Sequence, residues 1–447
     1  MSSIPFRPQF RLLPLLLALG LGASAQAQSL VDLYTAARAY DASYQSAKAQ
    51  YDATLYKADQ ARALVLPKVG LSSAYSGSNY ESKSMPGAGS IDRGYTTQTI
   101  GISASHPLYH PADDASYQQS LRANDQATAA LKAAEQDLIV RLSQAYFDVL
   151  ASSDSLAFVK AQKAAVQEQL ASAKRNFEVG TATITDTREA QARFDLVIAQ
   201  EIAADNDLRV KNLALANLVG QQTAHPKPLV EPVALETFAA TDVDAWVSRS
   251  QSEHPAIKQL QVALDIAQLE TRKARAGHLP TLDLVAGYQA ATNNGSATLG
   301  TNYGSNATSI GVNFTLPLFA GYAIQNREKE TVSLEEKARA DLASTQRAVA
   351  QGTRAAFYGV ESGLGQVKAF EAADMSSQSA LDANKLGYQV GVRINIDVLN
   401  AQSQVFDTKA KLSKARYDVL MGSLRLRQAS GTLAEADLQP VNALLAK

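Results

Sequence analysis

Two carboxylates occupy the same place in two similar stretches of this sequence. Asp186 ends the run VGTATITD and Asp397 ends the run VGVRINID, so each lies six residues after a glycine. A glycine that lets the chain reverse, followed by an aspartate, is typical of a turn that leads into a new helix. A carboxylate in the first turn of a helix is favourable by about 0.3–1 kcal/mol and can also attract cations. Helix stabilisation alone would explain each aspartate, so a cation-attracting role needs support from the rest of the chain.

The residue types that usually carry catalysis or metal binding are sparse. The chain has no cysteine, which excludes a disulfide framework, a thiolate metal site and a cysteine nucleophile. No Walker loop and no Gly-x-Ser-x-Gly motif occurs, so any energy that the protein needs must come from a partner. The sequence therefore predicts no enzyme, no cofactor and no metal site. Interface or structural roles are expected for the five histidines, which lack ligand spacing supported by carboxylates: His106, His110, His225, His254 and His278.

The two turns belong to a duplication that covers most of the chain. Gly180 and Gly391 are 211 residues apart, as are Asp186 and Asp397. A period of this length is too long for a solenoid repeat, so we predict two related halves in equivalent environments, at about 29–222 and 245–435. Three further landmarks recur in the same order at offsets of 210 to 213 residues: Tyr146-Phe147 with Phe357-Tyr358, Pro107 with Pro317, and Pro67 with Pro280.

The first 27 residues have the features of a secretory signal. Arg7 and Arg11 precede an apolar run at 12–21, and small residues follow it. This pattern predicts a signal peptide that is cut before Gln28. The alternative is an N-terminal membrane anchor, for which the apolar run is too short. The net charge of −1 over 447 residues does not indicate a nucleic-acid partner.

Each half contains two segments in which apolar residues alternate with polar ones. Alternation of this kind predicts a strand with one apolar face, and about 10 residues is the length of a tilted strand that crosses a membrane. A soluble β-hairpin would show the same alternation, so the pattern alone leaves both alternatives open. The strands are expected near 68–79, 97–106, 282–290 and 310–316, with polar, glycine-rich loops at 80–94 and 293–309.

Two long helical stretches favour the membrane alternative. From Ala112 to Phe177 the chain has no proline and no glycine, and small or apolar residues recur at coiled-coil spacing. A helix of this length would extend about 100 Å, which no compact globule can hold. The equivalent stretch in the second half, about 322–387, carries glycine at 352, 359, 363 and 365 and is expected to be less regular.

The number of strands predicts how the chain assembles. Four strands cannot close a barrel, because the smallest bacterial barrels need about eight. We therefore expect a homotrimer in which four strands per chain form a 12-stranded β-barrel in outer-membrane lipid, continuing into a long periplasmic α-helical barrel. The fold class is a mixed α and β membrane protein with an internal tandem duplication.

The sequence resembles the TolC family of trimeric outer-membrane channels over essentially the whole mature chain. The stretch GYQVGVRINIDVLNAQSQVFDTKAKLSKARYDVLMGSLRLRQASGTL, at 387–433, matches the family's second turn and the helix after it. The stretch FEVGTATITDTREAQARFD, at 177–195, matches the first turn. Because no cysteine follows the signal, the chain is similar to the TolC branch rather than to the lipidated efflux channels.

The resemblance and the duplication together predict the organisation of the chain. The expected parts are a signal peptide at 1–27; a first repeat at 28–222 with a helix, a strand pair at 68–106, a long helix at 111–177 and a return helix at 184–220; a collar segment at 223–255; a second repeat at 256–433 with a helix, a strand pair at 281–317, a long helix at 322–387 and a return helix at 394–430; and a tail at 434–447.

The resemblance also implies which residues close the pore. Asp397 would form a ring of three carboxylates at the constriction. The second carboxylate of the family's constriction falls here on Asn400, so the ring would carry about −3 rather than −6 and bind multivalent cations more weakly. The implied latch residues at the tip are Tyr388 and Arg393, with Asp186 and Thr185 as their partners. The implied adaptor-docking turns are Val179, Gly180 and Thr181, and Val390, Gly391 and Val392.

The expected function is that of a passive exit duct for tripartite efflux or type I secretion. A periplasmic adaptor and an inner-membrane transporter, either ABC-type or proton-driven, would dock at the tip and open it. The alternative from the residues alone is an exported coiled-coil filament protein without a channel, which needs no alternating strands. The cargo is not predictable from the sequence.

Overall fold

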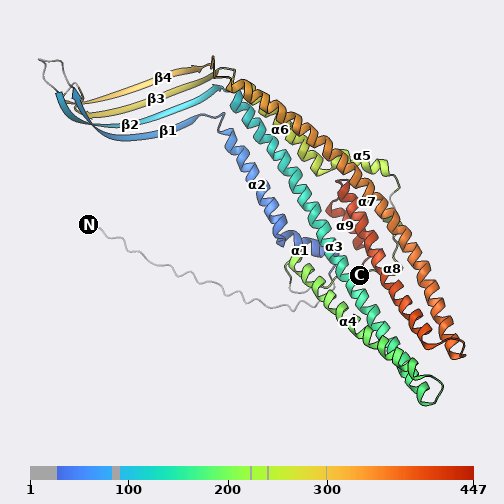
Figure 1. Ribbon diagram of the computed structural model, residues 1–447. Coiled ribbons are helices and arrows are strands. Elements are labelled where there is room, and N and C mark those ends of the chain that lie inside the picture. The colour runs from blue at the N-terminus through green and yellow to red at the C-terminus, as the bar shows by residue number, and fades with distance from the viewer. Residues whose placement is uncertain (1–27, 83–90, 222–223, 239–240, 298–299, 447) are drawn as a thin grey trace, which may run out of the picture.

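The computed structural model describes residues 28–82, 91–221, 224–238, 241–297 and 300–446. It is an elongated molecule with a β-sheet at one end and helices that run to the other end (Figure 1). The two helix reversals lie at the far end from the sheet, and we call this end the tip. The predicted signal peptide at 1–27 lies outside the described residues.

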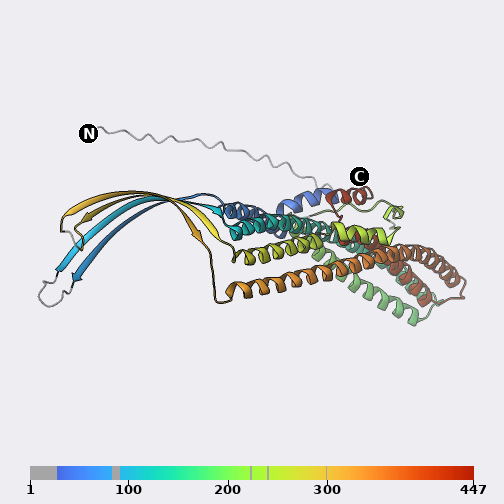
Figure 2. The ribbon, with the colours of Figure 1, turned by 90° about the horizontal axis from the view of Figure 1, so that it is seen from above.

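Four strands form one antiparallel sheet in the order β1-β2-β3-β4. They are β1 (Lys68–Ser82), β2 (Ile91–Tyr109), β3 (Thr281–Asn294) and β4 (Asn302–Thr315). The strands curve together as they lead into the helices (Figure 2). Within the described chain, β1 and β4 each pair on one side only, which leaves two free edges.

The strands are longer than the expected 10 residues, and the expected loops at 80–94 and 293–309 were too long. Residues of both expected loops continue the ladder, for example where Tyr80 faces Arg93 and where Asn294 faces Asn302. The physical reason is that ladder hydrogen bonds join backbone groups and are indifferent to side-chain polarity. The alternation of apolar and polar residues therefore indicated only the part of each strand that has an apolar face.

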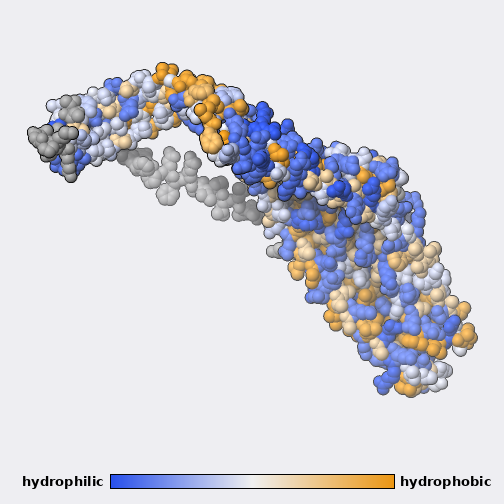
Figure 3. All heavy atoms as spheres, turned by 45° about the horizontal axis from the view of Figure 1, so that its top comes forward, coloured by the Kyte–Doolittle hydropathy of each residue, from blue (hydrophilic) through white to orange (hydrophobic). Residues whose placement is uncertain are grey.

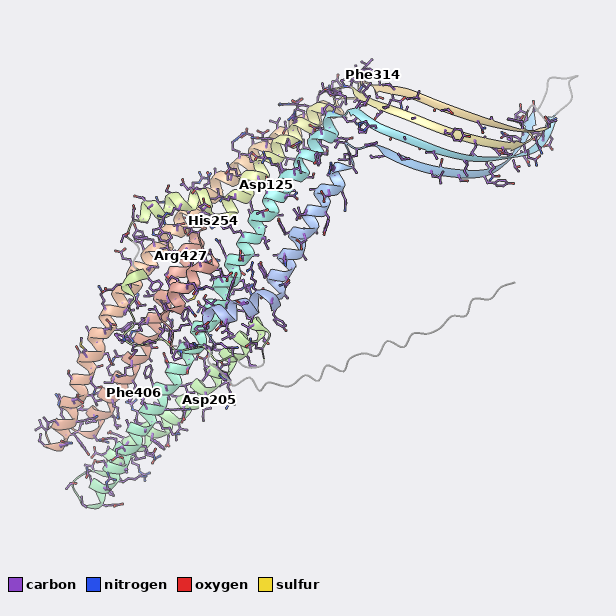
Figure 4. The ribbon with its side chains drawn as sticks, turned by 180° about the vertical axis from the view of Figure 1, so that it is seen from behind. Asp125, Asp205, His254, Phe314, Phe406 and Arg427 are labelled. Carbon is purple, nitrogen blue, oxygen red and sulfur yellow. The ribbon has the colours of Figure 1, made fainter. Side chains whose placement is uncertain are left out.

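One face of the sheet is apolar, as the alternation predicted. Leu71, Ile102 and Tyr288 are direct neighbours across three strands, so their side chains project from the same face. Leu71 is 75% exposed in the chain. Hydrophobic side chains gather on the strands near their junction with the helices (Figure 3), where Phe314 lies (Figure 4).

Nine α-helices occur in the described part of the chain, with two short 3-10 segments at Glu236–Phe238 and Glu435–Asp437. None of these helices is both long enough and apolar enough to cross a membrane. Their bounds are α1 (Leu30–Tyr40), α2 (Ala42–Arg62), α3 (Pro111–Glu178), α4 (Ile184–Val219), α5 (Val243–Glu253), α6 (Pro255–Ala276), α7 (Ala323–Gln389), α8 (Asn395–Ala429) and α9 (Leu438–Asn442).

The expectation that the second long helix is less regular was wrong. The α7 helix runs without a break through all four of its interior glycines. Each glycine costs roughly 1 kcal/mol relative to alanine in a helix interior. Packing of α7 against α6 and α8 offsets this cost, because tertiary contacts outweigh helix propensity.

The main hydrophobic core lies near the middle of the helical part, where α1, α3, α8 and α9 meet. Tyr146 and Phe147 on α3 are almost fully buried there, and their rings meet edge to face at 5.6 Å. The Tyr146 hydroxyl donates to the Lys227 carbonyl at 2.9 Å, which fastens the collar segment to α3. Short bridges join the same segment to residues close to the two ends of the described chain, Gln28 with Pro226 and Leu229 with Leu445.

The helix expected over about 29–65 is broken at Asp41, and the second repeat has an equivalent break at His254. Asp41 caps α2 by accepting from the Tyr44 amide at 2.8 Å, and Arg141 contacts both carboxylate oxygens at 3.0 Å. The hydrogen bonds from Arg141 hold the pKa of Asp41 below its usual range. His254 caps α6 by accepting from the Ala256 amide, and burial lowers its pKa. A capping side chain favours the extended backbone that ends one helix and starts the next.

Candidate functional site

The two helix reversals at the tip have the same backbone geometry. Gly180 joins α3 to α4 and Gly391 joins α7 to α8, each with φ of +78°. No atom lies within 4 Å of where a Cβ would stand at either glycine. Glycine is therefore needed for its backbone conformation and not for space. The turns close with backbone hydrogen bonds, from the Thr181 amide to Asn176 and from the Val392 amide to Gly387.

The first turn holds Asp186 in a capping box. The Thr183 hydroxyl donates to the Asp186 carboxylate at 2.7 Å, and the Thr183 amide donates to it at 2.9 Å. In return, the Asp186 amide donates to the Thr183 hydroxyl at 3.2 Å. This reciprocal arrangement satisfies free amides at the start of α4. The carboxylate of Asp186 is thus engaged by its own helix.

The second turn leaves Asp397 without such a partner. Ile394 stands at the N-cap of α8 and has no side-chain acceptor. The Asp397 carboxylate forms a long salt bridge with Arg393, whose guanidinium lies 3.7 Å away. Exposed pairs of this kind contribute about 0–1 kcal/mol, so Asp397 keeps a partly exposed and weakly held charge.

Arg393 itself is placed by a close approach to Gly387. A Cβ at Gly387 would lie 2.6 Å from the Arg393 side chain, so only glycine leaves room for the arginine against the last turn of α7. This contact gives a physical reason for the Gly-Tyr-x-Val-Gly-x-Arg pattern in the sequence.

A groove of about 650 Å³ separates the first hairpin, α3–α4, from the second, α7–α8, at the tip. Tyr388 and Arg393 line one side of it, and Asn176 and Asp186 line the other. The Tyr388 hydroxyl accepts from the Asn176 amide at 3.4 Å, which is a long hydrogen bond. The lower part of the two hairpins is shown in Figure 4, where Asp205 marks α4 and Phe406 marks α8.

Asn395 connects the two hairpins and was not among the predicted site residues. It is the first residue of α8 and is fully buried. Its side-chain oxygen accepts from Gln169 on α3, and its side-chain nitrogen donates to the Asp186 carbonyl at 3.3 Å. A usable signal was present, because a polar residue stands here between Ile394 and Ile396.

Asn400 also connects the hairpins. Its side-chain oxygen accepts from the guanidinium of Arg193 on α4 at 2.7 Å. Asn400 was placed at the constriction by resemblance alone, and no pattern in the sequence indicated Arg193. In the single chain, the amide therefore interacts with the first hairpin.

The predicted constriction ring needs three copies of Asp397, and a single chain contains one. The predicted latch links Tyr388 and Arg393 to the neighbouring hairpin, and a single chain can form such contacts. Within the described residues, Thr185 is exposed and makes no side-chain hydrogen bond, and Arg393 pairs with Asp397 rather than with Asp186. The latch set, the constriction set and the adaptor-docking turns thus stay predictions. No cluster of three or more potential metal-ligating side chains occurs among the residues that the structure describes.

The sequence profile described as outer membrane efflux protein matches residues 33–221 and 246–432. The two matches coincide with the two halves of the predicted duplication. Together they cover more than four-fifths of the chain.

Individual proteins are similar over nearly the full length. The chain is 34% identical to outer membrane protein TolC of Vibrio cholerae, over 97% of this chain and 98% of the relative. It is 30% identical to the alkaline protease secretion protein AprF of Pseudomonas aeruginosa, over 94% of this chain and 88% of that one. Among solved structures, the outer membrane protein VceC of Vibrio cholerae aligns with a TM-score of 0.75 and 18% identity, over 90% of this chain and 96% of that one.

Proposed function

Because the chain belongs to the outer membrane efflux protein family, we propose that its helical tip is a latched gate that a periplasmic partner opens. Membership makes the chain an outer-membrane efflux or type I secretion channel of the TolC type. Such channels lie in the outer membrane of Gram-negative bacteria and extend into the periplasm. They are transport proteins and not enzymes, and they work as trimers with efflux machinery.

The observation that supports the gate is the pair of helix reversals at the end of the molecule farthest from the sheet. In a trimer these reversals would converge, and three copies of the partly exposed Asp397 would face one another. A ring of carboxylates attracts cations and repels anions at a narrow opening. The free sheet edges at the other end support closure of the wall by neighbouring chains.

The partners follow from the chemistry that the chain lacks. It has no nucleotide-binding loop, so the energy for transport comes from an inner-membrane pump, either ABC-type or proton-driven. A periplasmic adaptor would contact the exposed turns around Gly180 and Gly391 and release the latch. The exported-filament alternative predicts no paired strands and does not fit a four-stranded sheet with an apolar face.

The latch is tested by single-channel recording in planar bilayers. Replacing Tyr388 with Phe and Arg393 with Ser removes the hydroxyl and the charge that line the groove, and should raise the conductance several-fold. The matched control replaces Tyr358 with Phe and Arg347 with Ser on α7, away from the tip, and should conduct like the unaltered protein. Unchanged conductance of the tip variant, in trimers that still run as heat-resistant bands, would remove the latch assignment.

A further inference from the structure

A buried amide at the tip makes hydrogen bonds that exist only while the two hairpins lie together. Asn395 is 0% exposed, although it is polar and lies close to the end of a long helical hairpin. It accepts from Gln169 on α3 and donates to the backbone of Asp186 on α4. One side chain of the second hairpin is thus bonded to both helices of the first.

The equivalent position in the first repeat argues against a general need for an amide here. Asn395 corresponds to Ile184 at the offset of 211 residues, and both are the first residue of a returning helix. Ile184 is 50% exposed and starts α4 without a polar side chain. The helix start therefore does not require asparagine. The hydrogen bonds to the first hairpin are therefore the reason that we give for an amide side chain at position 395.

A second contact between the hairpins lies one to two turns farther along α8. Arg193 on α4 donates to the Asn400 amide oxygen at 2.7 Å. Five residues separate Asn395 from Asn400, which corresponds to about 7.5 Å along a helix. The two contacts approach α8 from the same hairpin, so they resist the same movement, a separation of α8 from α4.

We propose that Asn395 and the Arg193–Asn400 pair are positioning residues that hold the second hairpin against the first and keep the tip closed. The proposal rests on the proposed gate function and extends it to residues outside the predicted latch. When the hairpins separate, the Asn395 amide loses both partners and must be hydrated. Opening is therefore opposed at a place that the constriction carboxylate does not touch.

The main test is the variant Asn395→Leu, which keeps the branching at Cγ and the number of heavy atoms and removes both hydrogen bonds. Because a lost hydrogen bond shifts an equilibrium by about tenfold, the open fraction of single channels should rise by about tenfold or more. Arg193→Gln should produce a smaller rise, since its contact is exposed. The control Gln378→Leu removes an amide that bonds only within α7, to Asp382, and should leave the open fraction unchanged.

A double-mutant cycle on Gln169 and Asn395 distinguishes a hydrogen bond that holds the hairpins together from simple packing. Gln169→Leu should also raise the open fraction, and adding Asn395→Leu should raise it by less than the product of the two single effects, because both remove the same bond. A purely structural role predicts fewer heat-resistant trimers with no change in the open fraction of those that form.

The outcomes separate this proposal from the gate itself. Normal open fractions in both Asn395→Leu and Arg193→Gln, with intact trimers, would overturn the positioning role and leave the latch test unaffected. If Asn395→Leu yields no trimers, the open fraction of the Arg193→Gln variant is the test of the positioning role. An unaltered protein that forms no channels in bilayers would instead overturn the gate function on which the inference rests.

Discussion

The two tip turns have the same backbone but different side chains at the start of the returning helix. Gly180 and Gly391 share a φ of +78°, and the residues before them share a φ of −91°. The N-cap is Thr183 in the first turn and Ile394 in the second. The threonine engages Asp186 in a capping box, whereas the isoleucine leaves Asp397 without a capping partner. The N-cap side chain thus accompanies the difference between an aspartate that caps its own helix and one whose carboxylate has no capping partner.

The same kind of divergence occurs at the helix breaks near the middle of the molecule. Asp41 and His254 both cap the following helix, so the break itself is common to both repeats. Asp41 is buried and forms a salt bridge with Arg141, while His254 is partly buried and has a lowered pKa. Duplication preserved the backbone at both places and changed the titration behaviour. The repeats are therefore equivalent in architecture and specialised in electrostatics.

The largest expected effect comes from removing the aspartate of one turn at a time. Asp397→Ala should weaken block by trivalent cations by about tenfold or more, because the proposed ring loses all its charge. The measurement is the blocking concentration in planar bilayers. Asp186→Ala is the comparison, since its carboxylate is held by Thr183, and it should weaken block much less than Asp397→Ala does. Equal block by both variants would show that the two aspartates do not differ as described.

A smaller effect is expected from converting the second turn into the first. Ile394→Thr supplies the missing N-cap acceptor, and Asp397 stands three residues later, as a capping box requires. The start of α8 should be stabilised by about 1 kcal/mol, seen as slower hydrogen exchange of its first amides. Trivalent block should weaken, though less than in Asp397→Ala, because the carboxylate is drawn to its own helix. Faster exchange, or stronger block, would contradict the comparison.

The smallest expected effect concerns the helix breaks. Burial lowers the pKa of His254, so the folded chain binds fewer protons there than the unfolded chain. Stability from this site is present above the unfolded pKa of about 6.5 and is lost as pH falls below it. His254→Asn keeps a capping side chain and cannot titrate, so it should flatten the decline in melting temperature between pH 7.5 and pH 5.

Asp41 should affect stability over a different pH range from His254, so it serves as the comparison in that experiment. Arg141 lowers its pKa, so its contribution persists above about pH 4 and is lost only at more acid pH. Asp41→Asn should therefore lower stability at pH 7.5 and leave the slope between pH 7.5 and pH 5 unaltered. Identical slopes for the unaltered protein and His254→Asn would refute the assigned role of His254.

The sequence predicted the architecture because periodicity and duplication are properties of long segments. The strand pairs, the long helices and the reversals at Gly180 and Gly391 all lie where repeated patterns placed them. The break at Asp41 was missed, because a single capping residue gives a weak signal inside a helical pattern, whereas the break at His254 lies next to the predicted boundary at 255/256. The length of the strands beyond Asn79 was missed because backbone pairing does not depend on alternation.

Less of the site could be predicted, because its contacts join residues far apart in the chain. Gln169 and Asn395 are separated by 226 residues, and Arg193 and Asn400 by 207. No local pattern links either pair. Resemblance supplied Asp397 and Asn400 as pore residues, but it could not indicate that Asn400 is bonded to Arg193, since that contact depends on both residues of this particular chain.

The two free edges of the sheet have a consequence for how many channels a cell can make. Unpaired backbone groups on β1 and β4 are too costly to place in hydrocarbon, so a lone subunit cannot insert its sheet stably. Insertion and association must then occur as one event, whose rate depends on encounters between several subunits. Channel number should consequently rise more steeply than subunit synthesis, so that a modest change in expression becomes a larger change in export capacity.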